Sequence, residues 1–141
     1  MRPQTVRRAA AAPVQKALYQ RLSTGDELVA AAPGYDHVPE DAVYPYWTVG
    51  EAVESPDNTL DTFGAVVLAG VHVWSDYKGF VEPNTIGGLI VARLDRQHRV
   101  LDVEGHRVVA VRFQQMQPVK DPDPKIRHVI VRFQVVTEQK D

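Results

Sequence analysis

Two runs of alternating residues near the end of the sequence constrain the fold most. Residues 107–115 and 126–137 each alternate apolar with polar side chains, the pattern of a strand with one face in a core and one in contact with water or a polar partner. The predicted inward side chains are Val109, Val111, Phe113, Val129, Val131, Phe133 and Val135. The predicted outward ones are Arg112, Gln114, His128, Arg132 and Gln134.

A proline-rich segment joins the two runs. Residues 117–125 contain Pro118, Pro122 and Pro124, which lack the backbone N–H that a central strand needs. We therefore predict that this segment is a loop and that the two runs form a long antiparallel hairpin.

Two further strands are predicted upstream. Residues 65–75, AVVLAGVHVWS, are apolar on both faces, so we expect helices or a neighbouring subunit to cover each face. Residues 46–54 alternate less cleanly, and Glu51 falls on the apolar side. The apolar side of that strand is predicted to carry Trp47, Val49 and Val53, and the polar side Thr48 and Glu54.

Helical spacing occurs twice, and a short helical turn is predicted at 27–32. Residues 13–22 place Val14, Leu18 and Leu22 on one face, and residues 82–97 carry a similar stripe. Helices do not alternate regularly with strands, which argues against a doubly wound parallel sheet. The sequence therefore predicts an α+β fold, a mainly antiparallel sheet with two helices packed on one face, ending in a long β-hairpin.

The composition fits one domain. The chain has 141 residues, 44% hydrophobic and 24% charged, a net charge of −2 and no cysteine. Because there is no cysteine, a disulfide scaffold and a cysteine-ligated metal site are excluded. Because the net charge is slightly negative, the chain as a whole has no positive potential that would attract nucleic acid. We expect residues 1–12 to be a basic, flexible N-terminal arm and residues 13–141 to form a single domain.

No arrangement of residues points to catalysis, a metal or a cofactor. No serine lies in a G-x-S-x-G motif, and no pair of histidines has the spacing of a metal site on a helix. His72 lies in a mainly apolar strand, which favours a hydrogen-bonded structural role over a functional one. We therefore predict a protein that is not an enzyme and needs no cofactor.

Three stretches, in order, resemble one family. The first stretch carries an "ALY-x-x-L" helix, then an acidic residue with "L-V", and then "V-P" and "P-Y". The second carries an apolar-x-apolar-Trp-Ser pattern, followed by a glycine turn and a helix. The third is an Arg-His pair that opens a strand. The residues concerned are Ala17–Tyr19, Leu22, Asp26, Leu28, Val29, Val38, Pro39, Pro45, Tyr46, Val71, Val73–Ser75, Gly79, Ile86–Leu94, Arg127 and His128. Over residues 13–137 the sequence resembles the tail-completion, or tail-terminator, proteins of long flexible-tailed bacteriophages, with relatives in prophages and gene transfer particles.

The resemblance implies a structural virion protein. Members of this family usually form a hexameric ring that caps the head-proximal end of the tail tube, stops tube polymerisation and joins the tail to the head connector. The implied partners are further copies of the chain, the tail tube protein and the connector protein, with DNA passing through the lumen without sequence-specific binding and no membrane. The implied location is the virion tail, with assembly in the host cytoplasm. Another head–tail connector or minor virion protein remains an alternative, as does a small intracellular enzyme or ligand-binding module.

Candidate contact residues follow from exposure and charge. The arginines of the arm can pair with carboxylates of a partner. The polar loops predicted at residues 55–63 and 117–125 can touch tube or connector, and the apolar strand 65–75 can be buried between subunits. The candidate interface residues are Arg2, Arg7, Arg8, Asp57, Asn58, Asp61, Val71, Val73, Lys120 and Asp123.

Overall fold

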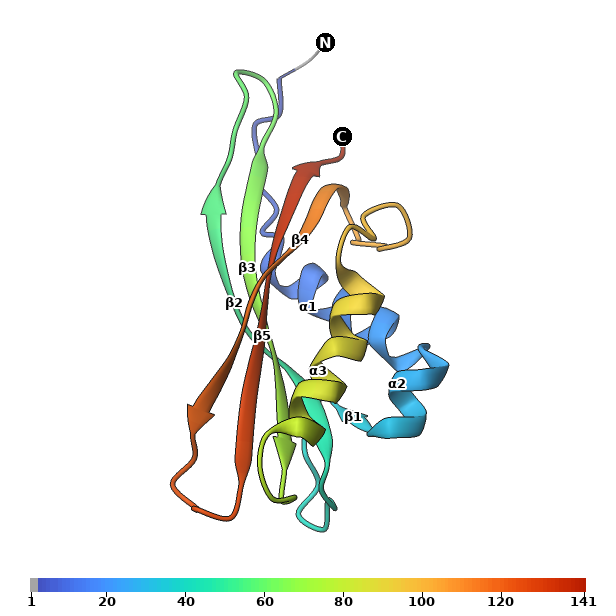
Figure 1. Cartoon of the computed structure of the whole chain (residues 1–141). Helices are drawn as coiled ribbons and strands as arrows, with labels where there is room; N and C mark the ends of the chain where they lie inside the picture. Colours follow the sequence, from blue (N-terminus) through green and yellow to red (C-terminus); the bar gives the residue numbers. More distant parts are fainter. Residues whose placement is uncertain (1–2) are drawn as a thin grey trace.

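The computed structural model, which describes residues 3–141, is an α+β fold with one five-stranded sheet. The elements in chain order are α1 (Ala11–Ser23), α2 (Asp26–Ala31), β1 (Gly34–Tyr35), β2 (Tyr46–Pro56), β3 (Gly64–Ser75), α3 (Val81–Leu94), β4 (His106–Lys120) and β5 (Arg127–Gln139). The strands are ordered β1-β2-β3-β5-β4, and every pairing is antiparallel except that of β1 with β2. The three helices lie on one side of the sheet (Figure 1). The predicted fold class and the terminal hairpin are thus confirmed.

The core lies between the helices and one face of the sheet. Trp47 and Phe133 are its largest fully buried side chains, and Leu18 and Leu22 of α1 and Ile90 of α3 cover them from the helical side. The Trp47 indole N–H also donates to the Ala32 carbonyl at 3.2 Å, so this ring is satisfied as well as buried. The four predicted inward residues of β5 are all completely buried, which confirms the face assigned to that strand.

An irregularity in β2 exchanges the faces predicted for its second half. The register against β3 shifts between Val49 and Ala52, which moves every later side chain to the opposite face. Val53 is therefore 57% exposed on the open side, and the Glu54 carboxylate lies on the helical side against the start of α1. Both predictions for these two residues were wrong because the alternation continues in the sequence across the irregularity.

A similar irregularity changes β4. Its register against β5 shifts between Val108 and Ala110 and again between Phe113 and Gln115. Val108 is consequently buried. Val111 is buried as predicted, whereas Val109 and Phe113, which we also predicted to point inward, are 38% and 36% exposed.

The proline-rich segment is shorter than predicted as a loop. β4 continues through Pro118 to Lys120, so part of residues 117–125 is strand. Pro118 is tolerated because β4 is the last strand in the sheet, where one side of the backbone needs no partner strand. None of the helices in the described part of the chain is long and apolar enough to span a membrane.

Candidate functional site

The described helices leave the opposite face of the sheet uncovered (Figure 1). In β3 the odd-numbered side chains are buried beneath the helices, while Leu68 is 47% exposed and His72 and Trp74 are half-buried on the other face. The apolar character of both faces of β3, noted in the sequence, thus corresponds to one covered face and one that no element of residues 3–141 covers. We call this second surface the open face.

A hydrogen-bonded cluster of ionisable side chains crosses the open face over three strands. His72 of β3 lies between Glu51 of β2 and His128 of β5, with its Nε2 2.7 Å from the Glu51 carboxylate and its Nδ1 2.7 Å from the His128 Nε2. Arg132 of β5 donates to the other Glu51 oxygen at 3.2 Å. His72, which the sequence favoured as a hydrogen-bonded structural histidine, therefore makes two side-chain hydrogen bonds.

Burial and neighbouring charges shift the pKa values of two members of this cluster, His128 and Glu51. Burial lowers the pKa of His128, the charge of His72 lowers it further, and the carboxylates of Asp121 and Glu51 only partly oppose these effects. Burial alone would raise the pKa of Glu51, but hydrogen bonds from His72 and from its own backbone N–H, with the charges of His72 and Arg132, lower it below its ordinary value. Glu51 is thus held ionised, and His128 resists becoming charged.

Aromatic rings extend this cluster towards one end of the open face. Trp74 stacks on His128 with ring centroids 4.5 Å apart and on His72 at 5.5 Å. Tyr46 lies 5.4 Å from Trp74, and Tyr44 stacks on Tyr46 at 5.2 Å. Half-buried rings of this kind offer a partner flat apolar area together with polar edges.

Each of the two outer edges of the sheet is covered over part of its length. On β4, the Phe113 N–H donates to the Asp95 carboxylate at 2.9 Å and the Val111 carbonyl accepts from Arg96 N–H at 2.8 Å. On β2, the short strand β1 pairs with Trp47 and Thr48. Among the described residues, no other element forms backbone hydrogen bonds with the outer side of β4 over residues 114–120 or of β2 over residues 51–56. We call these two stretches the free edge segments.

The N-terminal segment lies against the end of the sheet where the chain also finishes (Figure 1). The Arg7 guanidinium donates to the Gly64 carbonyl at 3.0 Å and to the Asn58 side chain, and it lies over the Phe63 ring at 4.9 Å. The Gln4 N–H donates to the Asp61 carbonyl at 2.9 Å. The segment therefore contacts the loop 57–63 between β2 and β3.

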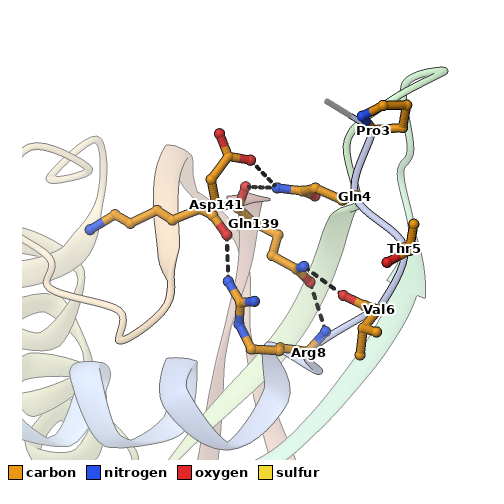
Figure 2. A pocket seen from close by; sticks show the side chains of 8 residues that line it. Pro3, Gln4, Thr5, Val6, Arg8, Gln139 and Asp141 are labelled. Atoms are coloured by element: carbon orange, nitrogen blue, oxygen red, sulfur yellow. Dashed lines mark hydrogen bonds between the residues drawn. The ribbon is translucent and has the colours of Figure 1, made fainter. Parts of the chain in front are cut away.

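Gln139 fastens the same segment to β5, as Figure 2 shows. Its buried side-chain amide donates to the Val6 carbonyl at 2.8 Å and accepts from Arg8 N–H at 2.7 Å. The Gln4 side chain reciprocates by donating to the Gln139 carbonyl at 2.9 Å. These contacts line a shallow open pocket formed by residues 3–6, Arg8 and residues 139–141.

The sequence-predicted contact residues fall into three groups. Arg7, Arg8, Asp57, Asn58 and Asp61 lie at the end described above, and Lys120 and Asp123 lie at the opposite end, on the hairpin tip. Val71 and Val73 are completely buried beneath the helices, so they belong to the core and cannot face a neighbour. Arg2 lies outside the described residues.

Sequence reasoning missed Glu51 and His128 as partners of His72, and Arg132 as a partner of Glu51. The alternation in 126–137 correctly turned His128 and Arg132 outward, but only the strand order places β5 beside β3 and brings His128 to His72. Within residues 3–141, no group of three histidine, aspartate or glutamate side chains is arranged to hold a metal ion.

Comparisons with known proteins identify the class of protein to which this architecture belongs. A chain from a solved structure described as "Virion of native gene transfer agent (GTA) particle" has the same fold, with a TM-score of 0.85 and 22% identity over 94% of this chain and 99% of that chain. No curated protein matches the sequence. The family model described as tail completion protein gp17 matches residues 16–138, so the chain belongs to that family. The family resemblance inferred from the sequence is confirmed, and the chain is a structural protein of a phage-type tail.

Proposed function

We propose that this chain is a tail terminator. Six copies form a ring on the head-proximal end of the tail tube, where the ring stops tube polymerisation and joins the tail to the head connector while DNA passes through its lumen. Family membership and the fold shared with a chain of a gene transfer agent virion support this role. The proposal gives the chain no catalytic part, and it places the protein in the host cytoplasm during assembly.

The free edge segments are the observation that carries the ring. Antiparallel pairing from β2 through β3 and β5 to β4 gives β2 and β4 opposite directions. When two copies sit side by side, residues 114–120 of one can therefore pair with residues 51–56 of the next in the antiparallel sense. Such contact is heterologous, and repetition of a heterologous contact by rotation closes a ring.

The positions of the two segments also fix how copies are offset. The free segment of β4 lies in its C-terminal half, and that of β2 lies in its C-terminal half, at the other end of the sheet. Pairing them shifts each copy along the strand direction relative to its neighbour. A constant shift of this kind tilts the strands relative to the axis, as closed barrels require.

In such a ring, the two ends of the sheet in each copy remain available to the tail tube and the connector. One end carries loop 57–63, with Leu60 fully exposed at its tip, together with the N-terminal segment. The other carries the hairpin tip with Lys120 and Asp123, beside the exposed Tyr77. We propose that these ends contact the tail tube and the connector.

Cysteine cross-linking in assembled particles tests the ring. Because the chain has no cysteine, introduced pairs report only on the designed contact. We expect mild oxidation of the double variants V53C with Q117C and S55C with Q115C, which share one antiparallel register, to produce covalent ladders ending at six subunits. The matched control places T48C and R112C on the covered parts of the same two edges and should give no ladder.

Copy number provides the second readout. A particle that contains a single copy of the chain contradicts the ring. Assembled particles in which neither free-edge pair forms a disulfide contradict the pairing of β4 with β2. A monomer in dilute solution contradicts neither, because such a ring can close on the tail alone.

A further inference from the structure

The hydrogen-bond geometry of the Glu51–His72–His128 cluster on the open face limits the number of protons that the cluster can bind. The ionised Glu51 carboxylate only accepts hydrogen bonds, so His72 must carry a proton on the Nε2 that lies 2.7 Å from it. In a neutral imidazole the other nitrogen is then an acceptor. The Nδ1 of His72 therefore accepts from His128 Nε2–H across their 2.7 Å contact.

One additional proton fits this arrangement. His72 then carries protons on both nitrogens and lies between the Glu51 carboxylate and His128, which moves its own proton to Nδ1 and accepts on Nε2. A second additional proton does not fit. Both imidazoles would present N–H groups to each other, and two positive charges would face across a contact that now measures 2.7 Å.

The surroundings relieve that repulsion only in part. From β5, Arg132 binds the free Glu51 oxygen and adds a positive charge, and from β4 the uncharged Val119 is paired with His128. The β4–β5 loop contributes one carboxylate, Asp121, whose charge acts on His128. Trp74 of β3 stacks on one face of each imidazole and limits the access of water to that face.

We propose that Glu51, His72 and His128 form a proton-operated clasp that ties β2, β3 and β5 together on the open face and opens when its second proton is added. Closed, the clasp holds both imidazoles flat against Trp74. When the clasp is open, the two charged imidazoles separate and Trp74 loses its stacking partner. The open face of the sheet then carries two separate positive charges. The lowered pKa of His128 agrees with this limit of one proton. The clasp is a property of the single chain and does not depend on the ring.

Nitrogen NMR of the full-length chain tests the clasp. Long-range proton–nitrogen spectra from pH 8 to pH 4.5 report the protonation of each ring nitrogen, and ring-to-ring contacts report the distance. At pH 5.5, where an independent imidazole of ordinary pKa is about nine-tenths charged, we expect the pair to have taken up one proton rather than two. The second proton should arrive at lower pH together with loss of the ring-to-ring contact.

Variants and an internal reporter separate the clasp from general acid unfolding. H128Q keeps a side chain able to bond His72 but removes the second charge, so the low-pH step should disappear. H37Q, at an exposed histidine outside the cluster, should leave both steps unchanged. Uptake of both protons in one step, or arrival of the second with the contact intact, overturns the proposal. So does loss of the buried Trp47 indole signal in the same step.

Discussion

At the scale of single residues, Glu54 shows how one side chain connects a strand to a helix. α1 has no capping side chain of its own, and its first backbone N–H groups would otherwise be left without partners. The Glu54 carboxylate accepts from the N–H groups of Ala10 and Ala11 at 2.9 Å each, and its negative charge also suits the positive end of the helix. A strand residue thus supplies the cap.

We expect E54A to lower the free energy of unfolding by about 1–2 kcal/mol, the usual effect of losing a cap at a partly buried helix start. Denaturant unfolding measures it. The matched control is E138A, which removes an exposed ion pair with Arg107 and should change stability by less than about 1 kcal/mol. Equal effects of the two substitutions would contradict the capping role.

Two histidines make the fold sensitive to acid. Burial lowers the pKa of His106 and the nearby Arg8 lowers it further, while burial and then His72 lower the pKa of His128. Below about pH 6.5 the unfolded chain therefore takes up protons at these rings before the folded chain does. We expect the free energy of unfolding to fall between pH 7.5 and pH 5.5, with a smaller fall in H106Q and in H128Q. An unchanged pH profile in both variants would contradict this assignment.

The large core side chains form a third test at this scale. Trp47 and Phe133 are each 0% exposed, so replacement by alanine leaves a cavity in addition to the lost burial. We expect W47A and F133A each to cost about 3–5 kcal/mol. A denaturation midpoint that neither substitution moves would show that these rings do not support the core.

At the scale of elements, the N-terminal segment packs against one end of the sheet. We expected residues 1–12 to form a flexible arm, whereas α1 begins at Ala11, Ala10 is completely buried, and residues 4–8 bond to the loop 57–63 and to β5. The segment therefore sets the shape of the surface that we propose contacts a partner.

Deletion of residues 1–8 should leave the core folded but loosen the loop. Without Gln4 and Arg7, the loop loses the bonds at Asp61, Phe63, Asn58 and Gly64. We expect faster hydrogen exchange confined to residues 57–64 and weaker tail–head joining in a complementation assay. Normal infectious yield would mean that the segment is dispensable, and a general loss of protection would mean that the core needs it.

At the scale of the whole molecule, the cover of the sheet edges decides where another copy can add. Asp95 and Arg96 after α3 bond to Phe113 and Val111 in the middle of β4, and β1 pairs with the start of β2, which blocks continuation of the sheet there. What remains are the free edge segments at opposite ends of the sheet.

Assembly should therefore protect one half of β4 selectively. We expect the amides of residues 114–120 to exchange more slowly in assembled particles than in the isolated chain. Phe113, already bonded to Asp95, should change little and serves as the control within the same strand. Equal protection along all of β4, or no change at residues 114–120, would contradict edge pairing.

The sequence by itself determined the fold class, because alternation in β5 and helical spacing in α1 report directly which side chains leave water. It also determined the family, through an ordered set of short motifs. Only the tertiary structure decided the second half of β2, where the shift at Gly50 and Glu51 moves Val53 and Glu54 to new faces. Alternation along a chain carries no record of how one strand aligns with another. For the same reason, the cluster of Glu51, His72 and His128 is invisible in the sequence: its members come from three strands, and strand order and register alone bring them together.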